Sequence, residues 1–333
     1  MQKVRLTILI IACALLVVTS VCGGSELKIE KVKYFDQPNC YKLSNGDVEV
    51  IATSDIGPRI IRYSFPGGKN MLAELGPGPT VKTELGDWHP YGGHRLWHAP
   101  EELPRSYVPD NKPVKVEQIG KNTISLTEDV ESATNIEKTM MIHLDETGAR
   151  VIITHTLTNR GLWPIELAPW ALTIVSGGGT TIIPNEPYIS HDDKLLPARP
   201  MAIWHYTDFS GSRWKLGKKF IRLSTDEKQD EPQKLGVADK QGWAGYLRKG
   251  ELFVKTFPYV EGAKYPDFGC NCETYTAGTF MEIESLGPLV NLEPGKSVSH
   301  VEHWYLFKGV DAGPTEDTLE AALKPLLAQT KTK

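Results

Sequence analysis

The chain has 333 residues, of which 40% are hydrophobic and 23% are charged, with 30 glycines and 23 prolines. This composition excludes a disordered chain and is sufficient for one large β domain or two ordinary ones. The 41 acidic and 37 basic residues give a net charge of −4, and no block of Lys and Arg is present. The sequence therefore lacks the electrostatic features of a nucleic-acid-binding protein, and we expect a small or neutral ligand.

The first residues have the pattern of an export signal. Lys3 and Arg5 precede an apolar run over residues 6–18, and small residues follow it up to Gly24. The run is shorter than the ~20 apolar residues that a membrane-spanning helix needs. We therefore expect residues 1–23 to be a signal peptide and the mature protein to be exported, whether periplasmic, secreted or lipid-anchored at the cell envelope.

Two cleavage outcomes remain open for this leader. A signal peptidase would cut after Ser20 or Gly23, whereas a lipoprotein route would make Cys22 the lipidated first residue. Residues 19–21 lack the usual lipoprotein pattern before the Cys, while the Gly-Gly-Ser that follows it is typical of a tethered lipoprotein. A membrane is expected as a partner only through such an anchor on Cys22.

From residue 46 onwards the sequence predicts many short antiparallel strands. Alternating and β-branched residues mark them, Gly and Pro bound several of them, and residues 145–148 have the composition of a hairpin turn. The expected strands cover residues 48–53, 59–65, 123–126, 137–144, 150–158, 167–175, 217–223, 242–247, 251–257, 280–285 and 298–307.

Only the C-terminus has a helical pattern. Thr315 can cap this helix and Pro325 is expected to kink it. The face that would pack consists of Leu319, Ala322, Leu323, Leu326 and Leu327. The whole series predicts an all-β domain over residues 24–333, with two large antiparallel sheets packed face to face and a short C-terminal helix. A split in the proline-rich stretch 184–200 is the alternative.

Removal of the leader leaves the cysteines Cys40, Cys270 and Cys272, and also Cys22 if the cut precedes it. In an oxidising compartment Cys40 could pair with either of the other two. A bridge between Cys270 and Cys272 would be strained, and their Cys-x-Cys spacing is not that of redox or zinc motifs. For Cys270 and Cys272 we favour two small buried side chains, and the pairing of Cys40 stays open.

The densest group of chemically active side chains lies at residues 87–101, which we interpret as a ligand-binding loop. Tryptophan offers a flat face for a sugar ring, histidine titrates near neutral pH, and paired glycines let a ligand or another strand approach the backbone. The alternative is a packed corner of the sandwich. The binding candidates of this group are Trp88, His94, Arg95, Trp97, His98 and Glu101.

A second group contains Glu282 and Glu284. The period of two in a strand places both carboxylates on one face, ~7 Å apart. One could act as a general base while the other binds a hydroxyl group. An ordinary strand with a solvated charged face explains the same pattern, and the sequence leaves both interpretations open.

The remaining polar groups are weaker candidates. We expect His155 and Asn159 to be satisfied sheet residues, residues 191–193 to form a solvated turn, and His300 and His303 to lie at the surface. No serine-hydrolase elbow and no zinc-protease motif is present in the sequence. Neither a cofactor nor a metal ion is therefore expected.

Three blocks of the sequence resemble a bacterial domain family of unknown function in the galactose mutarotase-like superfamily. They are residues 56–70, 92–101 and 282–295, with residues 265–271 as a further marker, and the likeness extends over nearly all of the mature chain. The resemblance implies a β-supersandwich that binds a sugar on the concave face of one sheet.

In the epimerases of that superfamily, a Glu on a late strand removes the proton of the anomeric hydroxyl while a His protonates the ring oxygen. The resemblance places Glu284 at the position of that Glu, and Arg95 on the early strand that contacts sugar hydroxyls. Where the epimerases carry a catalytic His, this chain has Pro169 and Trp170, which cannot transfer a proton.

Two functions therefore remain open. The first is an exported protein that binds a small-molecule or oligosaccharide ligand without chemistry of its own. It would use Trp88, Arg95, Trp97 and the two glutamates, with Trp170 as a further contact. The second is an aldose 1-epimerase-like enzyme with Glu284 as general base and His98 as general acid. Fold analogy does not choose between them.

Overall fold

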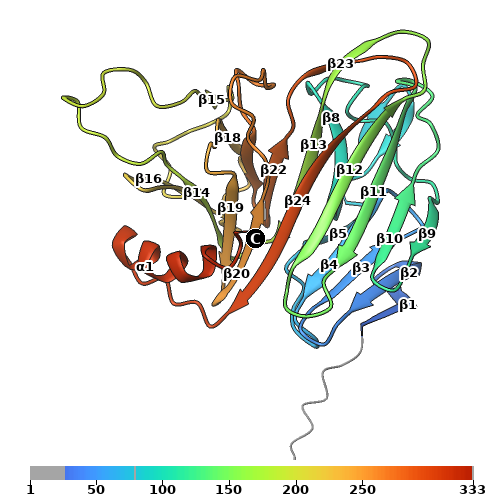
Figure 1. The fold of residues 1–333 in the computed structure, drawn as a ribbon, viewed down its shortest axis with the longest axis horizontal. Coiled ribbons are helices and arrows are strands. Elements are labelled where there is room, and N and C mark those ends of the chain that lie inside the picture. Colours follow the sequence, from blue (N-terminus) through green and yellow to red (C-terminus); the bar gives the residue numbers. More distant parts are fainter. Residues whose placement is uncertain (1–26, 79, 332–333) are drawn as a thin grey trace, which may run out of the picture.

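The computed structural model describes residues 27–78 and 80–331, and most of its strands belong to two large antiparallel sheets (Figure 1). The expected fold class is thereby confirmed. The expected signal peptide and Cys22 lie outside the described residues. Among the residues described, no helix combines the length and apolar character needed to cross a membrane.

Sheet 1 has twelve strands, in the order β1-β2-β3-β4-β8-β13-β22-β21-β18-β15, with β5 beside β8 and β23 beside β13. Its strands are β1 (Lys28–Tyr34), β2 (Gln37–Ser44), β3 (Glu49–Thr53), β4 (Arg59–Ser64), β5 (Glu74–Gly76), β8 (Tyr91–Ala99), β13 (Ile165–Ser176), β15 (Met201–Ile203), β18 (Gln233–Val237), β21 (Cys272–Ala277), β22 (Phe280–Leu286) and β23 (Val290–Leu292).

Sheet 2 has ten strands, in the order β16-β17-β14-β19-β20-β24-β12-β11-β10-β9, and β6 pairs with β7 separately. The strands of sheet 2 are β9 (Lys115–Ile119), β10 (Thr123–Thr127), β11 (Ile136–Leu144), β12 (Val151–Asn159), β14 (Thr180–Pro184), β16 (Trp214–Leu216), β17 (Phe220–Ser224), β19 (Trp243–Arg248), β20 (Glu251–Thr256) and β24 (Ser297–Lys308). The separate pair consists of β6 (Val81–Thr83) and β7 (Gly86–Trp88).

The main apolar core fills the space between the two sheets. Ile60 and Ile283 reach it from sheet 1, while Ile153, Phe253 and Trp304 reach it from sheet 2, and all of them are buried. Burial of apolar surface is the dominant favourable contribution to folding. The inner faces of both sheets are therefore fixed by one shared core.

The C-terminal helix α1 (Glu316–Leu327) packs on the outer face of sheet 2, beside β14, β16 and β20 in Figure 1. Thr315 is its N-cap, as predicted, and accepts a hydrogen bond from the backbone N–H of Thr318. Leu319 and Leu323 are buried in a second cluster that also contains Leu252 of β20. The helix therefore covers apolar side chains that the main core leaves outside.

The strand β8 corrects our interpretation of residues 87–101 as a loop. Gly92 and Gly93 have φ angles of +79° and +71°, and a Cβ atom on them would lie 2.1 Å from the carbonyl oxygen of Ala73 and 2.3 Å from that of Ile60. The paired glycines thus serve the close approach of neighbouring backbone. Both faces of β8 are buried, so its polar and apolar residues do not alternate as in a half-exposed strand.

The three cysteines of the described residues, Cys40, Cys270 and Cys272, are buried and free. The interpretation of Cys270 and Cys272 as small buried side chains is therefore confirmed. Burial is the main cause that raises the pKa of the Cys270 thiol to about 12. Such a thiol is a small packing group with little thiolate at neutral pH.

The packing of α1 gives a first prediction. Leu323→Ala should lower the free energy of unfolding by about 2–5 kcal/mol, because it opens a cavity under the helix. Leu326→Ala, the same change at a partly buried position of the same helix, should cost about 1 kcal/mol. Urea unfolding followed by tryptophan fluorescence measures both, and equal losses would contradict the proposed packing.

Candidate functional site

A cavity of about 680 Å³ opens on the face of sheet 1 that points away from the main core. The aromatic side chains that line it are Trp88, Trp97, Tyr107, Trp170, Trp204, Tyr206, Tyr275 and Phe280. The charged side chains that line it are Arg95, Glu101, Lys234 and Glu282. Its volume and its mixture of aromatic walls with a few polar groups are typical of small-molecule sites.

Strand register brings the two predicted groups of residues together. Arg95 of β8 pairs with Leu172 of β13, and Leu172 pairs on its other side with Glu284 of β22. Residues directly opposite each other in antiparallel strands project from the same face. Arg95, Leu172 and Glu284 therefore form one row, and Trp97 and Trp170 lie opposite each other in the next row.

Glu284 is fully buried beside the cavity. Its Oε2 accepts hydrogen bonds from the indole Nε1 of Trp170 at 2.8 Å and from the Nζ of Lys234 at 3.1 Å. Its Oε1 has no hydrogen-bond partner among the described residues. One oxygen of this carboxylate is thus held by the protein while the other is left unpaired.

Lys234 is a site residue that the sequence analysis missed. Its Nζ lies 2.9 Å from Glu273 and 3.1 Å from Glu284, and it sits over the rings of Trp170 and Trp204. Burial alone would lower the pKa of this ammonium group, but Glu273 and Glu284 raise it well above its ordinary value. Lys234 is therefore a charged link between two carboxylates.

Glu282 lies on the same face of β22 as Glu284 and lines the cavity. Burial is the main cause that raises its pKa to about 7, and the nearby Glu284 carboxylate raises it further while Arg95 lowers it. The alternative of an ordinary solvated charged face is wrong, because Glu284 is fully buried and Glu282 is half-buried.

His94 and His98 lie on the opposite face of β8 from Arg95 and Trp97, and neither lines the cavity. The Nδ1 of His98 accepts a hydrogen bond from Arg105 at 3.1 Å, and its Nε2 lies 3.6 Å from Glu131. Burial is the main cause that lowers its pKa. A proton from His98 would have to cross sheet 1 to reach a ligand beside Glu284.

The other predicted contacts do reach the cavity. Glu101 accepts a hydrogen bond from the hydroxyl group of Tyr107 at 2.5 Å. The indole Nε1 of Trp88 is buried without a hydrogen-bond partner among the described residues. Trp97 contacts the rings of Trp88 and Trp170, with ring centroids 5.6 and 5.2 Å away. These side chains build one aromatic wall.

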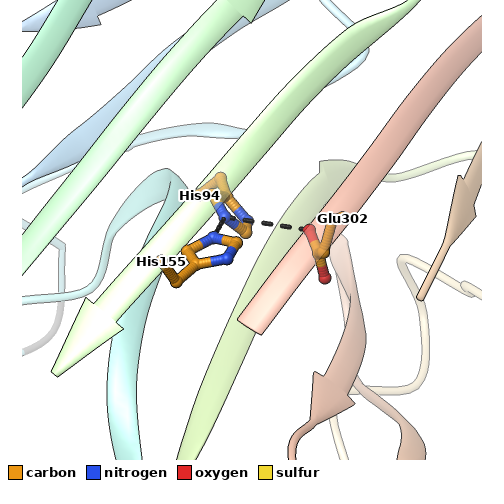
Figure 2. A group of neighbouring side chains, drawn as sticks. All are labelled: His94, His155 and Glu302. Atoms are coloured by element: carbon orange, nitrogen blue, oxygen red, sulfur yellow. Dashed lines mark hydrogen bonds and ion pairs between the residues drawn. The ribbon is translucent and has the colours of Figure 1, made fainter. Parts of the chain in front are cut away.

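A second polar cluster lies between the two sheets, where His94 of β8, His155 of β12 and Glu302 of β24 turn toward one another (Figure 2). One nitrogen of each histidine and one oxygen of Glu302 all lie within 4.8 Å of one another. Two histidines and a carboxylate at this spacing are a donor set that zinc accepts. The cluster was not expected from the sequence as a group.

All four imidazole nitrogens of His94 and His155 have hydrogen-bond partners within the protein. The Nδ1 of His155 lies 3.0 Å from the carbonyl oxygen of His300 and must donate to it, so the Nε2 of the neutral ring is an acceptor. The Nε2 of His94, 2.7 Å away, donates to it, and the Nδ1 of His94 accepts from Thr173 at 2.9 Å. Both rings are thus neutral.

Glu302 is also fully engaged. Its carboxylate accepts hydrogen bonds from Lys255 at 2.6 Å, Ser285 at 2.5 Å and Trp304 at 2.8 Å. The ammonium group of Lys255 opposes the binding of a metal cation to the same carboxylate. We therefore interpret the cluster as a hydrogen-bonded network that joins the inner faces of the two sheets.

His300 belongs to the same network, so its predicted position at the surface is wrong. It is buried, and its Nε2 lies 2.6 Å from the hydroxyl group of Ser285. Since β24 runs between β20 and β12 in the middle of sheet 2, its inward side chains face sheet 1. Burial lowers the pKa of His300 to about 3, and also lowers the pKa of His94 and His155.

The expectations for His155, Asn159 and residues 191–193 are confirmed. His155 and Asn159 are satisfied sheet residues, and Asn159 donates hydrogen bonds to the carbonyl oxygens of Trp163 and Leu292 at 2.8 Å each. Residues 191–193 form an exposed turn. None of these residues lines the cavity.

The network gives a prediction for pH dependence. The unfolded His300 has a pKa near ~6.5, above its folded value, so below that pH only the unfolded chain takes up the proton. Protonation of His300 in the unfolded chain should therefore lower the free energy of unfolding by ~1.4 kcal/mol per pH unit as the pH falls from ~6.5 towards the folded pKa. The free energy of unfolding of His300→Gln should therefore change less with pH than that of the wild type, by ~1.4 kcal/mol per pH unit.

Urea unfolding at several values between about pH 7 and pH 5 measures this slope. His191→Gln, at an exposed histidine, is the matched control and should keep the wild-type slope. Parallel curves for wild type and His300→Gln would show that His300 is not held neutral.

Comparison with solved structures identifies the fold. The chain superposes on a candidate aldose 1-epimerase from Klebsiella pneumoniae with a TM-score of 0.56 and 11% identity, covering 90% of this chain and 87% of the other. It superposes on a galactose mutarotase-like protein from Clostridium acetobutylicum with a TM-score of 0.51 and 12% identity, covering 85% and 99%. The fold is thus galactose mutarotase-like.

A further similar structure is a TPR-domain-containing protein from Parabacteroides distasonis, with a TM-score of 0.55 and 13% identity. The match covers 80% of this chain but only 46% of that one, so this chain spans about half of its length. No family model matches the sequence, and no curated protein matches it.

Proposed function

We propose that this chain is an exported protein that binds a carbohydrate in the cavity of sheet 1. The observation that carries the proposal is the cavity itself, which combines aromatic walls with charged groups at about 680 Å³. Aromatic rings pack against the apolar faces of sugar rings, and carboxylates accept hydrogen bonds from sugar hydroxyls. The export pattern of residues 1–23 supports a location at or beyond the cell envelope.

The charged residues have distinct parts in this proposal. Glu284 offers its unpaired Oε1 to a ligand hydroxyl, while Trp170 and Lys234 hold its other oxygen. Glu282 accepts a second hydroxyl when ionised and can donate when protonated, since its pKa is about 7. Fixed acceptors of this kind supply orientation and specificity more than bulk affinity.

Calorimetric titration with a panel of monosaccharides and disaccharides tests the proposal. The wild-type protein should bind at least one of them, and Glu284→Gln should weaken that binding about 10- to 100-fold because one charge-assisted hydrogen bond is lost. Glu146→Gln, at an exposed glutamate, should bind as the wild type does. Absence of binding across the panel would contradict a carbohydrate function.

A double-mutant cycle tests whether the two sides of the cavity form one site. Arg95→Ala and Glu284→Gln are measured singly and together with the sugar that binds best. Residues that contact the same ligand should show a coupling energy above about 0.5 kcal/mol. Strict additivity would place them in independent sites.

The second candidate function is an aldose 1-epimerase-like enzyme with Glu284 as general base. It is favoured by one observation, the unpaired Oε1 of a carboxylate next to the cavity. The general acid proposed from the sequence, His98, lies on the other face of β8. General acid catalysis needs a donor within hydrogen-bond reach of the reacting oxygen, so the geometry favours binding over epimerisation.

Polarimetry of freshly dissolved α-anomers of glucose, galactose and uronic acids separates the two functions. We expect the rate of interconversion to equal that in buffer alone, for sugars that calorimetry shows to bind. An acceleration that Glu284→Gln abolishes would instead support the enzyme. In that case His98→Gln should lower the rate about 10²–10⁴-fold only if His98 is the acid.

A further inference from the structure

The guanidinium group of Arg95 is a buried charge at the cavity that has neither a carboxylate partner nor a full set of hydrogen-bond acceptors among the described residues. Arg95 is 3% exposed and lines the cavity. Among residues 27–78 and 80–331, no ion pair joins it to an acidic side chain. Its one hydrogen bond goes from Nη1 to the carbonyl oxygen of Pro90 at 3.3 Å, and its Nε has no partner.

Four other buried cationic side chains of this protein each have a carboxylate partner. Arg59 lies 2.5 Å from Asp110, Lys255 lies 2.6 Å from Glu302, and Lys138 contacts Glu131. Lys234, in the same cavity, is shared by two glutamates. Burying an uncompensated charge is unfavourable, so a buried cation at a cavity that lacks such a partner lowers stability unless a ligand supplies one.

Arg213 shows how the chain satisfies a buried guanidinium without a carboxylate. It donates hydrogen bonds to the carbonyl oxygens of Gln229 and Glu231, at 3.1 and 2.8 Å. Arg95 receives no comparable set of acceptors. Its guanidinium carbon instead lies 4.6 and 4.4 Å from the ring centroids of Trp88 and Trp97, which fix its position without using its N–H groups.

We propose that the ligand carries an anionic oxygen group, which binds Arg95. This inference rests on the proposed carbohydrate function and names its substrate class, an acidic sugar. A guanidinium group recognises carboxylate, sulfate and phosphate through paired N–H donors. A buried, unpaired and positioned guanidinium group at the wall of a cavity is complementary to that chemistry.

The glutamates of the same sheet favour a ligand whose remaining groups are sugar hydroxyls rather than a bare anion. Glu282 and Glu284 lie across β13 from Arg95, where the one nearby cation among the described residues, Lys234, is already shared by Glu273 and Glu284. They would accept hydrogen bonds from neutral hydroxyl groups. Of the two cations that line the cavity, Arg95 is the one without an ion pair among the described residues, and a ligand with its anion at Arg95 and its hydroxyls at the glutamates matches this distribution of charge.

Calorimetry with matched pairs of sugars tests the inference. The pairs are galacturonic acid with galactose, glucuronic acid with glucose, and galactose 6-sulfate and glucose 6-phosphate with their parent sugars. We expect the wild-type protein to bind at least one acidic sugar about 10- to 100-fold more tightly than its neutral counterpart. Comparison of the uronates with the two esters shows which anion the site takes.

Arg95→Gln should remove this preference, weakening the acidic sugar about 10- to 100-fold and the neutral sugar less than about threefold. Arg160→Gln, at a surface arginine paired with Glu137, is the matched control and should leave both affinities unchanged. Equal affinities of the wild type for both members of every pair would overturn the inference. An equal loss for acidic and neutral sugars in Arg95→Gln would also overturn it, since Arg95 would then bind hydroxyl groups.

A second measurement is independent of the sugar. Sodium acetate and sodium sulfate, compared with sodium chloride at equal ionic strength, should raise the melting temperature of the wild type more than that of Arg95→Gln. If these anions protect the wild type selectively while no sugar binds, the anion site stands and the carbohydrate function fails. If neutral sugars bind but neither acidic sugars nor anions are favoured, the function stands and the anion site fails.

Discussion

The central strands of sheet 1 are buried on both faces, and this constraint organises the rest of the structure. One face of β8, β13 and β22 meets sheet 2, and the other meets the cavity. Polar groups on such strands cannot be left to water, so each must find a partner in the protein or in a ligand. On the face that meets sheet 2 these partners come from the protein, whereas on the face that meets the cavity a ligand can supply them.

The two faces meet this requirement in opposite ways. Between the sheets, the polar atoms of His94, His155, Lys255 and Glu302 all have partners within the protein. At the cavity, the Nε of Arg95 and the Oε1 of Glu284 have none among the described residues. A satisfied network stabilises a fold, whereas convergent unsatisfied groups at a cavity wall are complementary to a ligand. This contrast distinguishes the candidate site from the structural cluster, although both are rich in charged residues.

Much of this architecture was predictable because local pattern and burial agree in most strands. The strands around residues 137–158 and 298–307 and the capped C-terminal helix followed from alternation and helical periodicity. The strand β8 did not, because its two buried faces carry polar side chains and leave no alternation to detect. His300 was assigned to the surface for a related reason, since a histidine two residues before Glu302 gives no local sign of a position inside the sandwich.

The site itself was predictable only in part, because it depends on pairing between distant strands. Arg95 and Glu284 stood out by residue type, but their common row exists only through their shared neighbour Leu172. Lys234 and Glu273 gave no signal, since their strands β18 and β21 are short and mixed in composition. Both residues became part of the site through the register of sheet 1 alone.

In the site that we propose to bind a carbohydrate, Trp170 is a fixed hydrogen-bond donor to Glu284. By resemblance, this chain has Pro169 and Trp170 where the epimerases carry a catalytic His, and in the structure the indole Nε1 of Trp170 donates to Glu284 at 2.8 Å. An indole N–H is a donor only and does not give up its proton in the range where a histidine titrates. It therefore serves to hold the Oε2 of Glu284 in place, together with the ammonium group of Lys234. These two donors hold one oxygen of the carboxylate and leave Oε1 to accept a hydrogen bond from a ligand hydroxyl, while the indole N–H cannot act as the general acid that epimerisation needs.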